Sequence, residues 1–183
     1  MKIKAGFVPN SSSSSFLVAW PKRIESIEDV FTYISPEDKA KQVFEDSIHQ
    51  RNIFVVNADN NELISYIIQE FYCGYIDEIW EPYFGRSETE IFDYGLFRKN
   101  FLNRHQITAK ELRDNHTYEN LLWEEQRIYR EILAKEIALK FCRDNCNHLL
   151  YKFDYGDEDG DFFSEMEHGD TFINLPHIKI NKH

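Results

Sequence analysis

Residues that could bind a metal ion or transfer a proton gather around position 170. His168, Asp170 and His177 carry the imidazole and carboxylate groups that transition metals bind in proteins. Without a metal, Glu165 together with His168 and His177 could serve as general acid and base. The alternative is an ordinary surface segment, since charged side chains usually stay in water. The pattern predicts either a catalytic or metal site, with a divalent transition metal as cofactor, or a solvated tail.

A run of hydroxyl side chains near the start of the chain could bind a phosphate group or the backbone of a partner. These residues are Asn10, Ser11, Ser12, Ser13, Ser14 and Ser15. A P-loop needs glycine for close approach of the backbone and a lysine to reach the phosphates, and this run has neither. Two alternatives stay open. The serines could form a solvated turn that bonds to its own backbone, or they could donate hydrogen bonds to acids of the C-terminal segment.

Aromatic residues alternate with acids in a third candidate segment, whose members are Asp77, Glu78, Trp80, Glu81 and Tyr83. Tryptophan and tyrosine are the residues that most often anchor protein interfaces. Packing in the core is the ordinary explanation for such a cluster. The other interpretation is an acidic and aromatic interface that fits a basic groove on a partner.

The three cysteines are an odd number without the spacing of a disulfide framework. Cys142 and Cys146, with His148, could supply zinc ligands, but they lack a second ligand pair, and free cysteines are commonly buried. The chain shows no leader peptide and no apolar run of about 18 residues. These features predict a cytoplasmic protein without a membrane segment.

The formal net charge is −11, from 32 acidic and 21 basic residues. Binding to free nucleic acid depends on lysine and arginine side chains that neutralise phosphates. We therefore expect no direct nucleic-acid binding. An acidic surface attracts basic partners instead, so the charge favours a protein partner with a basic surface. Simple solubility is the alternative explanation.

The secondary structure that must position these groups is predicted to be strands near both ends of the chain. Residues 2–8 alternate weakly and residues 16–20 are apolar, which predicts two strands with the serines as a hairpin loop between them. Residues 148–155 alternate, with Tyr151 and Phe153 on one face, and residues 177–181 form a terminal strand. Another short strand is expected near Val55 and Val56.

The middle of the chain carries helix signals. A capping residue followed three positions later by an acid marks five helix starts: Ser26, Ser35 (with Pro36 as first helical residue), Asp59, Ser87 and Thr108. The strongest helix is predicted over about 117–145, and a short one over 162–168. The long helix is expected to carry one broad apolar stripe, formed by Leu121, Leu122, Ile128, Ile132, Leu133, Ile137 and Phe141.

Strands at both ends with helices between them predict an α+β fold. We expect a small sheet, built from N-terminal and C-terminal strands, packed on a layer of helices that includes one long amphipathic helix (about 117–145). A chain of 183 residues suits a single core. The prediction is therefore a single α+β domain over 1–183, with the helical middle (about 24–145) inserted between terminal strands.

The N-terminal string Gly6-Phe7-Val8-Pro9-Asn10, followed by five serines and Phe16, resembles the opening of an uncharacterised family of small phage and bacterial proteins. Members of that family begin with a Gly-Phe-Val-Ser-Asn-poly-Ser-Phe signature, and Pro9 stands where a serine is usual. The segment from Glu167 to His183 is similar to the tail of some members. The resemblance covers the two ends only. It implies a phage or mobile-element context and a cytoplasmic protein acting in a bacterial host.

Two functions follow as hypotheses. The first is a phage-type accessory protein that binds and modulates, or inhibits, a host or phage macromolecule, for example by occupying a basic nucleic-acid-binding groove. The alternative is a metal-assisted hydrolase or transferase acting on a phosphorylated or nucleotide substrate. It would use the serine-rich loop and the C-terminal cluster of histidines and acids. The alternative requires the two ends of the chain to meet in space.

Overall fold

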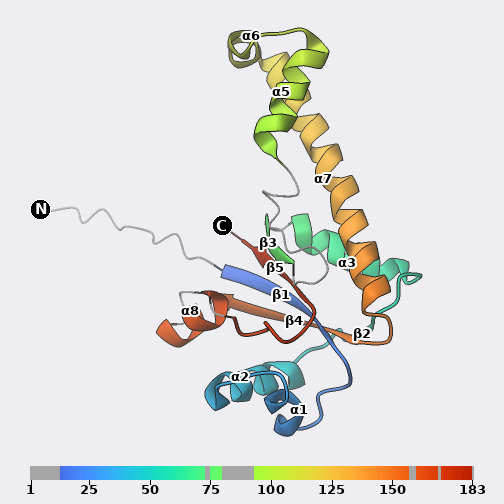
Figure 1. Ribbon diagram of the computed structural model, residues 1–183, viewed down its shortest axis with the longest axis vertical. Coiled ribbons are helices and arrows are strands. Elements are labelled where there is room, and N and C mark those ends of the chain that lie inside the picture. The colour runs from blue at the N-terminus through green and yellow to red at the C-terminus, as the bar shows by residue number, and fades with distance from the viewer. Residues whose placement is uncertain (1–12, 73–74, 80–92, 157–159, 169, 183) are drawn as a thin grey trace, which may run out of the picture.

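A computed structural model of the chain describes residues 13–72, 75–79, 93–156, 160–168 and 170–182 (Figure 1), and only the backbone of residues 75–79 and 168. Its helices and strands follow in chain order: β1 (Ser13–Trp20), α1 (Ile27–Phe31), α2 (Glu37–Ile48), β2 (Phe54–Val55), α3 (Asn61–Tyr72), β3 (Tyr75–Ile79), α5 (Tyr94–His105), α6 (Ala109–Asp114), α7 (His116–Asp144), β4 (Leu149–Gly156), α8 (Asp161–His168) and β5 (His177–Asn181).

The described strands form one five-stranded sheet in the order β2-β4-β1-β5-β3. β1 is the central strand, antiparallel to β4 along its whole length and to β5 on its other side. The predicted α+β fold is thus confirmed, with strands from both ends of the chain at the centre of the sheet. The middle of the chain adds the two edges, because β2 pairs with β4 and β3 pairs with β5.

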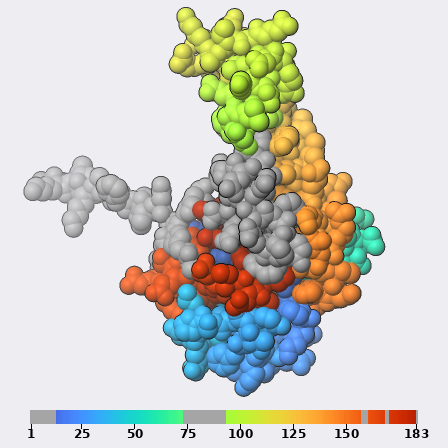
Figure 2. All heavy atoms as spheres, in the orientation of Figure 1, coloured from blue at the N-terminus to red at the C-terminus, as the bar shows by residue number. Residues whose placement is uncertain are grey.

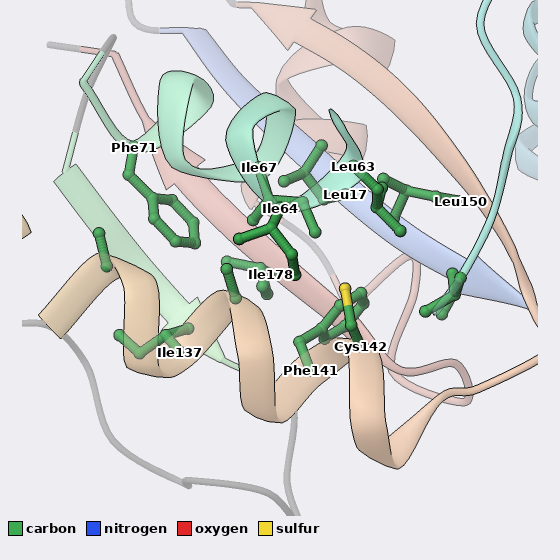
Figure 3. Close-up of a cluster of buried hydrophobic side chains, with 14 of the residues drawn as sticks. Leu17, Leu63, Ile64, Ile67, Phe71, Ile137, Phe141, Cys142, Leu150 and Ile178 are labelled. Atoms are coloured by element: carbon green, nitrogen blue, oxygen red, sulfur yellow. The ribbon is translucent and has the colours of Figure 1, made fainter. Parts of the chain in front are cut away.

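One face of the sheet packs against α3 and α7 (Figure 3). Leu17 and Ile178, which are register partners on β1 and β5, point toward this layer. Apolar side chains of α3 and of the C-terminal half of α7, among them Ile67 and Phe141, cover them. Alternation along the strands explains this layer, since every second residue faces it.

The opposite face of the sheet packs against α1, α2 and α8 and is rich in aromatic side chains. Tyr151, Phe153 and Tyr155 alternate along β4 on this side, as predicted, and their rings stack along the strand at 6.2 and 6.5 Å between centres. Phe172 stacks on Phe153 at 5.1 Å. The sheet is therefore buried on both faces between two helical layers, which explains the apolar run of β1.

A helical arm stands away from the sheet (Figures 1 and 2). It consists of α5, α6 and the first part of α7, which continues into the helical layer on the sheet. Phe101, Leu112 and Leu122 form a small buried cluster of their own inside the arm. Because α7 is one continuous helix, it joins the arm to the body of the protein.

The predicted hairpin loop of serines is wrong for residues 13–15, which form the first part of β1. Ser14 and Ser15 are buried and have register partners on both β4 and β5. Residues 2–8 and the first two serines lie outside the described residues. The error has a physical reason: the partners that make these serines extended and buried lie more than 100 residues away in the chain and leave no local signal.

The predicted helix starts are partly right. Thr108 begins α6 with a capping box, in which its backbone N–H donates to Glu111 at 2.7 Å and its hydroxyl accepts from the Glu111 N–H at 3.2 Å. Pro36 occupies the N-cap of α2 rather than the first helical position. At α3 the capping side chain is Asn60, which accepts from two backbone N–H groups, rather than Asp59. Ser87 lies outside the described residues.

The long helix is confirmed, but its predicted single stripe is wrong. Leu122, Ile137 and Phe141 are buried as expected. Leu121, Ile128 and Ile132 are exposed instead. Seven apolar positions at this spacing cover more than half the circumference of a helix, and α3, α5, α6 and the sheet cover only one side of α7. The apolar set therefore divides into a buried side and an outward side.

Candidate functional site

The strands from the two ends of the chain bring two of the predicted serines against acidic side chains. Ser14 lies on the face of the sheet that α8 covers, and its hydroxyl donates a 3.1 Å hydrogen bond to Oε1 of Glu167 in α8. Both side chains are buried. A carboxyl group removed from water needs such a partner, because burial without hydrogen bonds is costly. The contact joins β1 to α8 across 153 residues of sequence.

Ser15 faces the other side of the sheet and donates to Oδ1 of Asp154, its register partner on β4. Lys182 donates to the same oxygen at 3.0 Å, and Lys152 lies 3.5 Å from Oδ2. Burial raises the pKa of Asp154, but the Ser15 hydroxyl and the two lysines more than offset this effect, so the pKa lies below its ordinary value. Asp154 is therefore a charged cross-strand link at neutral pH.

His177 belongs to the core. Its Nδ1 donates a 2.9 Å hydrogen bond to the carbonyl oxygen of Leu175, and its ring lies 6.3 Å from that of Phe172. His177 is opposite Val18 in the sheet, four residues along β1 from Ser14. A strand rises by about 3.3 Å per residue, which separates Ser14 from His177 by about 13 Å. The two predicted groups thus share a face of the sheet without touching.

The other residues predicted to act as catalysts or metal ligands belong to α8 or follow it. Glu165 and Asp170 are exposed, and the backbone carbonyl of Glu165 accepts from Nζ of Lys39 at 3.3 Å. The side chain of His168 lies outside the described part of the structure. Over the described residues, no three histidine, cysteine or acidic side chains lie close enough together to hold a metal ion. The predicted metal site remains a prediction.

Lys179 completes a buried polar set with Ser14, Glu167 and His177 on the face that α8 covers. It stands opposite Phe16 in the sheet, with its Nζ 5.9 Å from the centre of that ring. Polar groups in an apolar layer stabilise one particular arrangement when their hydrogen bonds are satisfied. We interpret the set as a polar core that fixes how β1, β5 and α8 meet. This is the structural role considered above for the serines.

Most of the other predicted binding residues lie outside the described residues, namely Asn10, Ser11, Ser12, Trp80, Glu81 and Tyr83. Asp77 and Glu78 belong to β3, for which the backbone is described. Glu78 is the register partner of Lys179 on β5. The predicted acidic interface therefore begins on an edge strand of the sheet.

A pocket of about 560 Å³ opens between the end of α3 and the middle of α7. Its described walls include Phe71 and Tyr72 from α3, with Trp123 and Leu133 from α7. Tyr72 and Trp123 are 57 and 60% exposed, which is unusual for side chains of their size. The volume and the aromatic lining are typical of a binding site.

The charged groups that line the pocket are Glu124, Arg127 and Arg130, and with the neighbouring Glu131 their charges balance. Arg127 donates to Glu124 at 2.7 Å and lies 3.5 Å from Glu131, and this pairing lowers the pKa of the Glu124 carboxyl. The side-chain oxygen of Gln126, which also lines the pocket, is buried and has no hydrogen-bond donor among the described residues. A ligand that brings an apolar group and an N–H or O–H donor would satisfy both features.

The sequence interpretation missed this pocket. Asn120, Trp123, Arg127, Arg130 and Ala134 recur at spacings of three and four residues and thus share one side of α7. A tryptophan within a stripe of charged residues is the signal that could have identified it. The facing residues of α3 had no such signal, because they are distant in sequence.

Cys142 and Cys146, which were considered as zinc ligands, differ in accessibility, and this difference can be tested. Cys142 is buried in the core, and burial raises the pKa of its thiol to about 12, whereas Cys146 is exposed. A thiol with this pKa is protonated at pH 8 and is a poor nucleophile and a poor zinc ligand. Iodoacetamide should therefore label Cys146 and leave Cys142 unmodified.

Peptide mass spectrometry before and after unfolding in urea measures this difference. Both cysteines should react in urea, which serves as the control. Labelling of Cys142 in the folded protein at a rate comparable to that of Cys146 would contradict the described packing of α7.

Comparison of the chain with protein-family models, with curated proteins and with solved structures finds no match. Among the described residues, every helix is too short or too polar to pass through a lipid bilayer.

Proposed function

We propose that this protein is a phage-type accessory protein that binds and modulates a host or phage macromolecule, and that its partner is a protein. The pocket between α3 and α7 carries this proposal. It combines two large exposed aromatic side chains, Tyr72 and Trp123, with a buried oxygen of Gln126 to which no described residue donates a hydrogen bond. Interface hot spots are built from such aromatic residues around a pocket.

The contacts inside the pocket indicate the chemistry of the partner. Arg127 is paired with Glu124 and Glu131, and together with Arg130 these groups offer little net charge to a ligand. The aromatic walls suit an apolar or aromatic side chain of the partner. The Gln126 oxygen suits an N–H or O–H group next to that side chain. A protein segment with an apolar anchor and a neighbouring donor meets both requirements.

The distribution of charge supports a partner with a basic surface. Residues 93–135, which include the arm, contain eight basic and seven acidic residues and thus carry about +1. Because the whole chain carries −11, the residues outside this segment together carry −12. An acidic body attracts a basic partner over a distance of about one Debye length, while the nearly neutral pocket makes the short-range contacts. Such a partner includes the basic nucleic-acid groove considered above.

Replacing Trp123 by alanine should weaken partner binding at least tenfold, because an interface tryptophan commonly contributes more than about 1.4 kcal/mol. A photo-crosslinking amino acid at position 123, used in a bacterial lysate, identifies the partner. Titration calorimetry with the purified partner then gives the dissociation constants of the wild type and of Trp123→Ala.

Ile173→Ala is the matched control, because Ile173 is 54% exposed but is not part of the pocket. It should bind the partner as the wild type does. Equal affinities of the Trp123→Ala and wild-type proteins, or crosslinking at position 173 but not at position 123, would overturn the proposed site. If raising the salt concentration leaves the association rate unchanged, the partner does not use the acidic body.

A further inference from the structure

The outward side of α7 carries a stripe of apolar side chains that the described residues leave largely uncovered. Leu121, Ile128 and Ile132 are 37, 45 and 55% exposed. Positions 121, 128 and 132 all lie within about 40° of one another around the helix. This side is roughly opposite Phe141, which faces the core. Exposed aliphatic residues in a line are unusual for a helix in contact with water.

The stripe continues with a spacing of four and three residues, which is the spacing of a coiled-coil seam. We name it the α7 seam, and its members are Leu121, Glu125, Ile128, Ile132, Lys135 and Leu139. Leu139, at the end of the seam, is half-buried and also packs against the core, so only part of its side chain faces outward. The seam spans about 27 Å at 1.5 Å per residue. Two heptads and a half of such a repeat can pair with one other helix.

The residues of the seam complement those of a second copy that runs in the opposite direction. In an antiparallel pair of α7 helices centred between Ile128 and Ile132, each residue meets a partner of matching chemistry: Leu121 meets Leu139, Glu125 meets Lys135, and Ile128 meets Ile132. Each of these contacts occurs twice, because the pair has twofold symmetry. We propose that this protein forms an antiparallel homodimer through the α7 seam, independently of the proposed partner.

The charged groups near the seam are compatible with this pairing. Glu125 of the seam binds Arg104 and lies 3.0 Å from Nε2 of His105, both in α5, and its side chain stays 25% exposed. Lys135 is exposed and can approach the Glu125 of a second copy. Glu131, which lies next to the seam, is 3.5 Å from the guanidinium of Arg127, so that repulsion between the two copies is reduced.

Sedimentation velocity over a micromolar concentration series tests the dimer. The wild type should approach twice the monomer mass of 21.9 kDa as its concentration rises. The double variant Ile128→Glu/Ile132→Glu should remain a monomer throughout, because it places four carboxylates in the centre of the seam. Ile48→Glu is the control, since Ile48 is 57% exposed and belongs to α2, and it should behave as the wild type.

Two further measurements test the antiparallel order. Lys135→Glu should weaken the dimer at least tenfold. Adding Glu125→Gln should restore part of the affinity, because glutamine removes the repulsion between facing carboxylates without placing a cation beside Arg104 and His105, with circular dichroism as the check on folding. In a background with serine at Cys73 and Cys146, an equimolar mixture of Ile128→Cys and Ile132→Cys should form mixed disulfide dimers, and neither variant alone should do so.

A wild type that stays monomeric would overturn the proposal, as would a dimer that survives the two glutamates. Disulfide formation by Ile128→Cys alone would indicate a parallel arrangement and would also overturn it. Loss of partner binding in Trp123→Ala has no bearing on these outcomes, because Trp123 points to the pocket side of the helix.

Discussion

Replacing Phe153 by alanine should lower the free energy of unfolding by about 3–5 kcal/mol, the largest effect of any substitution considered for this protein. Phe153 is buried in the centre of the sheet on the face covered by α8. Its ring stacks on Tyr151, Tyr155 and Phe172. Alanine removes all three ring contacts and leaves a cavity that the sheet and α8 cannot close without moving the strands.

Urea unfolding followed by tryptophan fluorescence measures this loss as a lower midpoint at an unchanged slope. Phe31→Ala is the matched control, because Phe31 is an aromatic residue of α1 that is 41% exposed, and it should cost less than about 1 kcal/mol. All variants are compared at one protein concentration, since self-association would raise the apparent stability. A cost below about 1 kcal/mol for Phe153→Ala would contradict the aromatic core.

The second large effect is expected at Ser14, where alanine should cost about 1.5–3 kcal/mol. Its hydroxyl donates to the carboxyl group of Glu167 in a buried environment. Without that donor, Glu167 loses a hydrogen bond that water cannot replace inside the core. Ser15→Ala is the control with the same chemistry. It should cost less than about 1 kcal/mol, because Asp154 is half-exposed and keeps Lys182 as a partner.

A double-mutant cycle isolates the contact between Ser14 and Glu167. In a Glu167→Leu background, Ser14→Ala should cost less than about 0.5 kcal/mol, so that the two residues show a coupling of at least about 1 kcal/mol. Additive effects of the two substitutions would mean that the hydrogen bond contributes nothing to stability. A larger loss for Ser15→Ala than for Ser14→Ala would show that the charged link on the other face matters more.

The sheet could be predicted from the sequence because several of its strands have a recognisable local pattern. The apolar run at 16–20, the alternation over 148–155 and the terminal strand at 177–181 each mark a strand without knowledge of its partner. The central position of β1 follows from its apolar run, since only a strand covered on both faces tolerates one. The length of α7 follows from its continuous helical composition.

The site depended on contacts that no local pattern records. Ser14 and Ser15 have low strand preference, and they form a strand because Glu167 and Asp154 accept their hydroxyls. The prediction of a single apolar stripe on α7 was wrong for a related reason. The sequence shows that Ile128 and Ile132 are apolar and share one side of the helix, but only the positions of α3, α5, α6 and the sheet decide which sides are covered.

The strand order also sets a sequence of events for the nascent chain. β1 leaves the ribosome early, yet its register partners are residues 149–156 on one side and residues from His177 onward on the other. Until those residues are synthesised, the run Phe16–Trp20 has unpaired backbone groups and exposed apolar side chains, a combination prone to aggregation. The arm, whose contacts are local, can fold in the meantime. Efficient production of this protein should therefore depend on a chaperone that shields the first strand until the last one arrives.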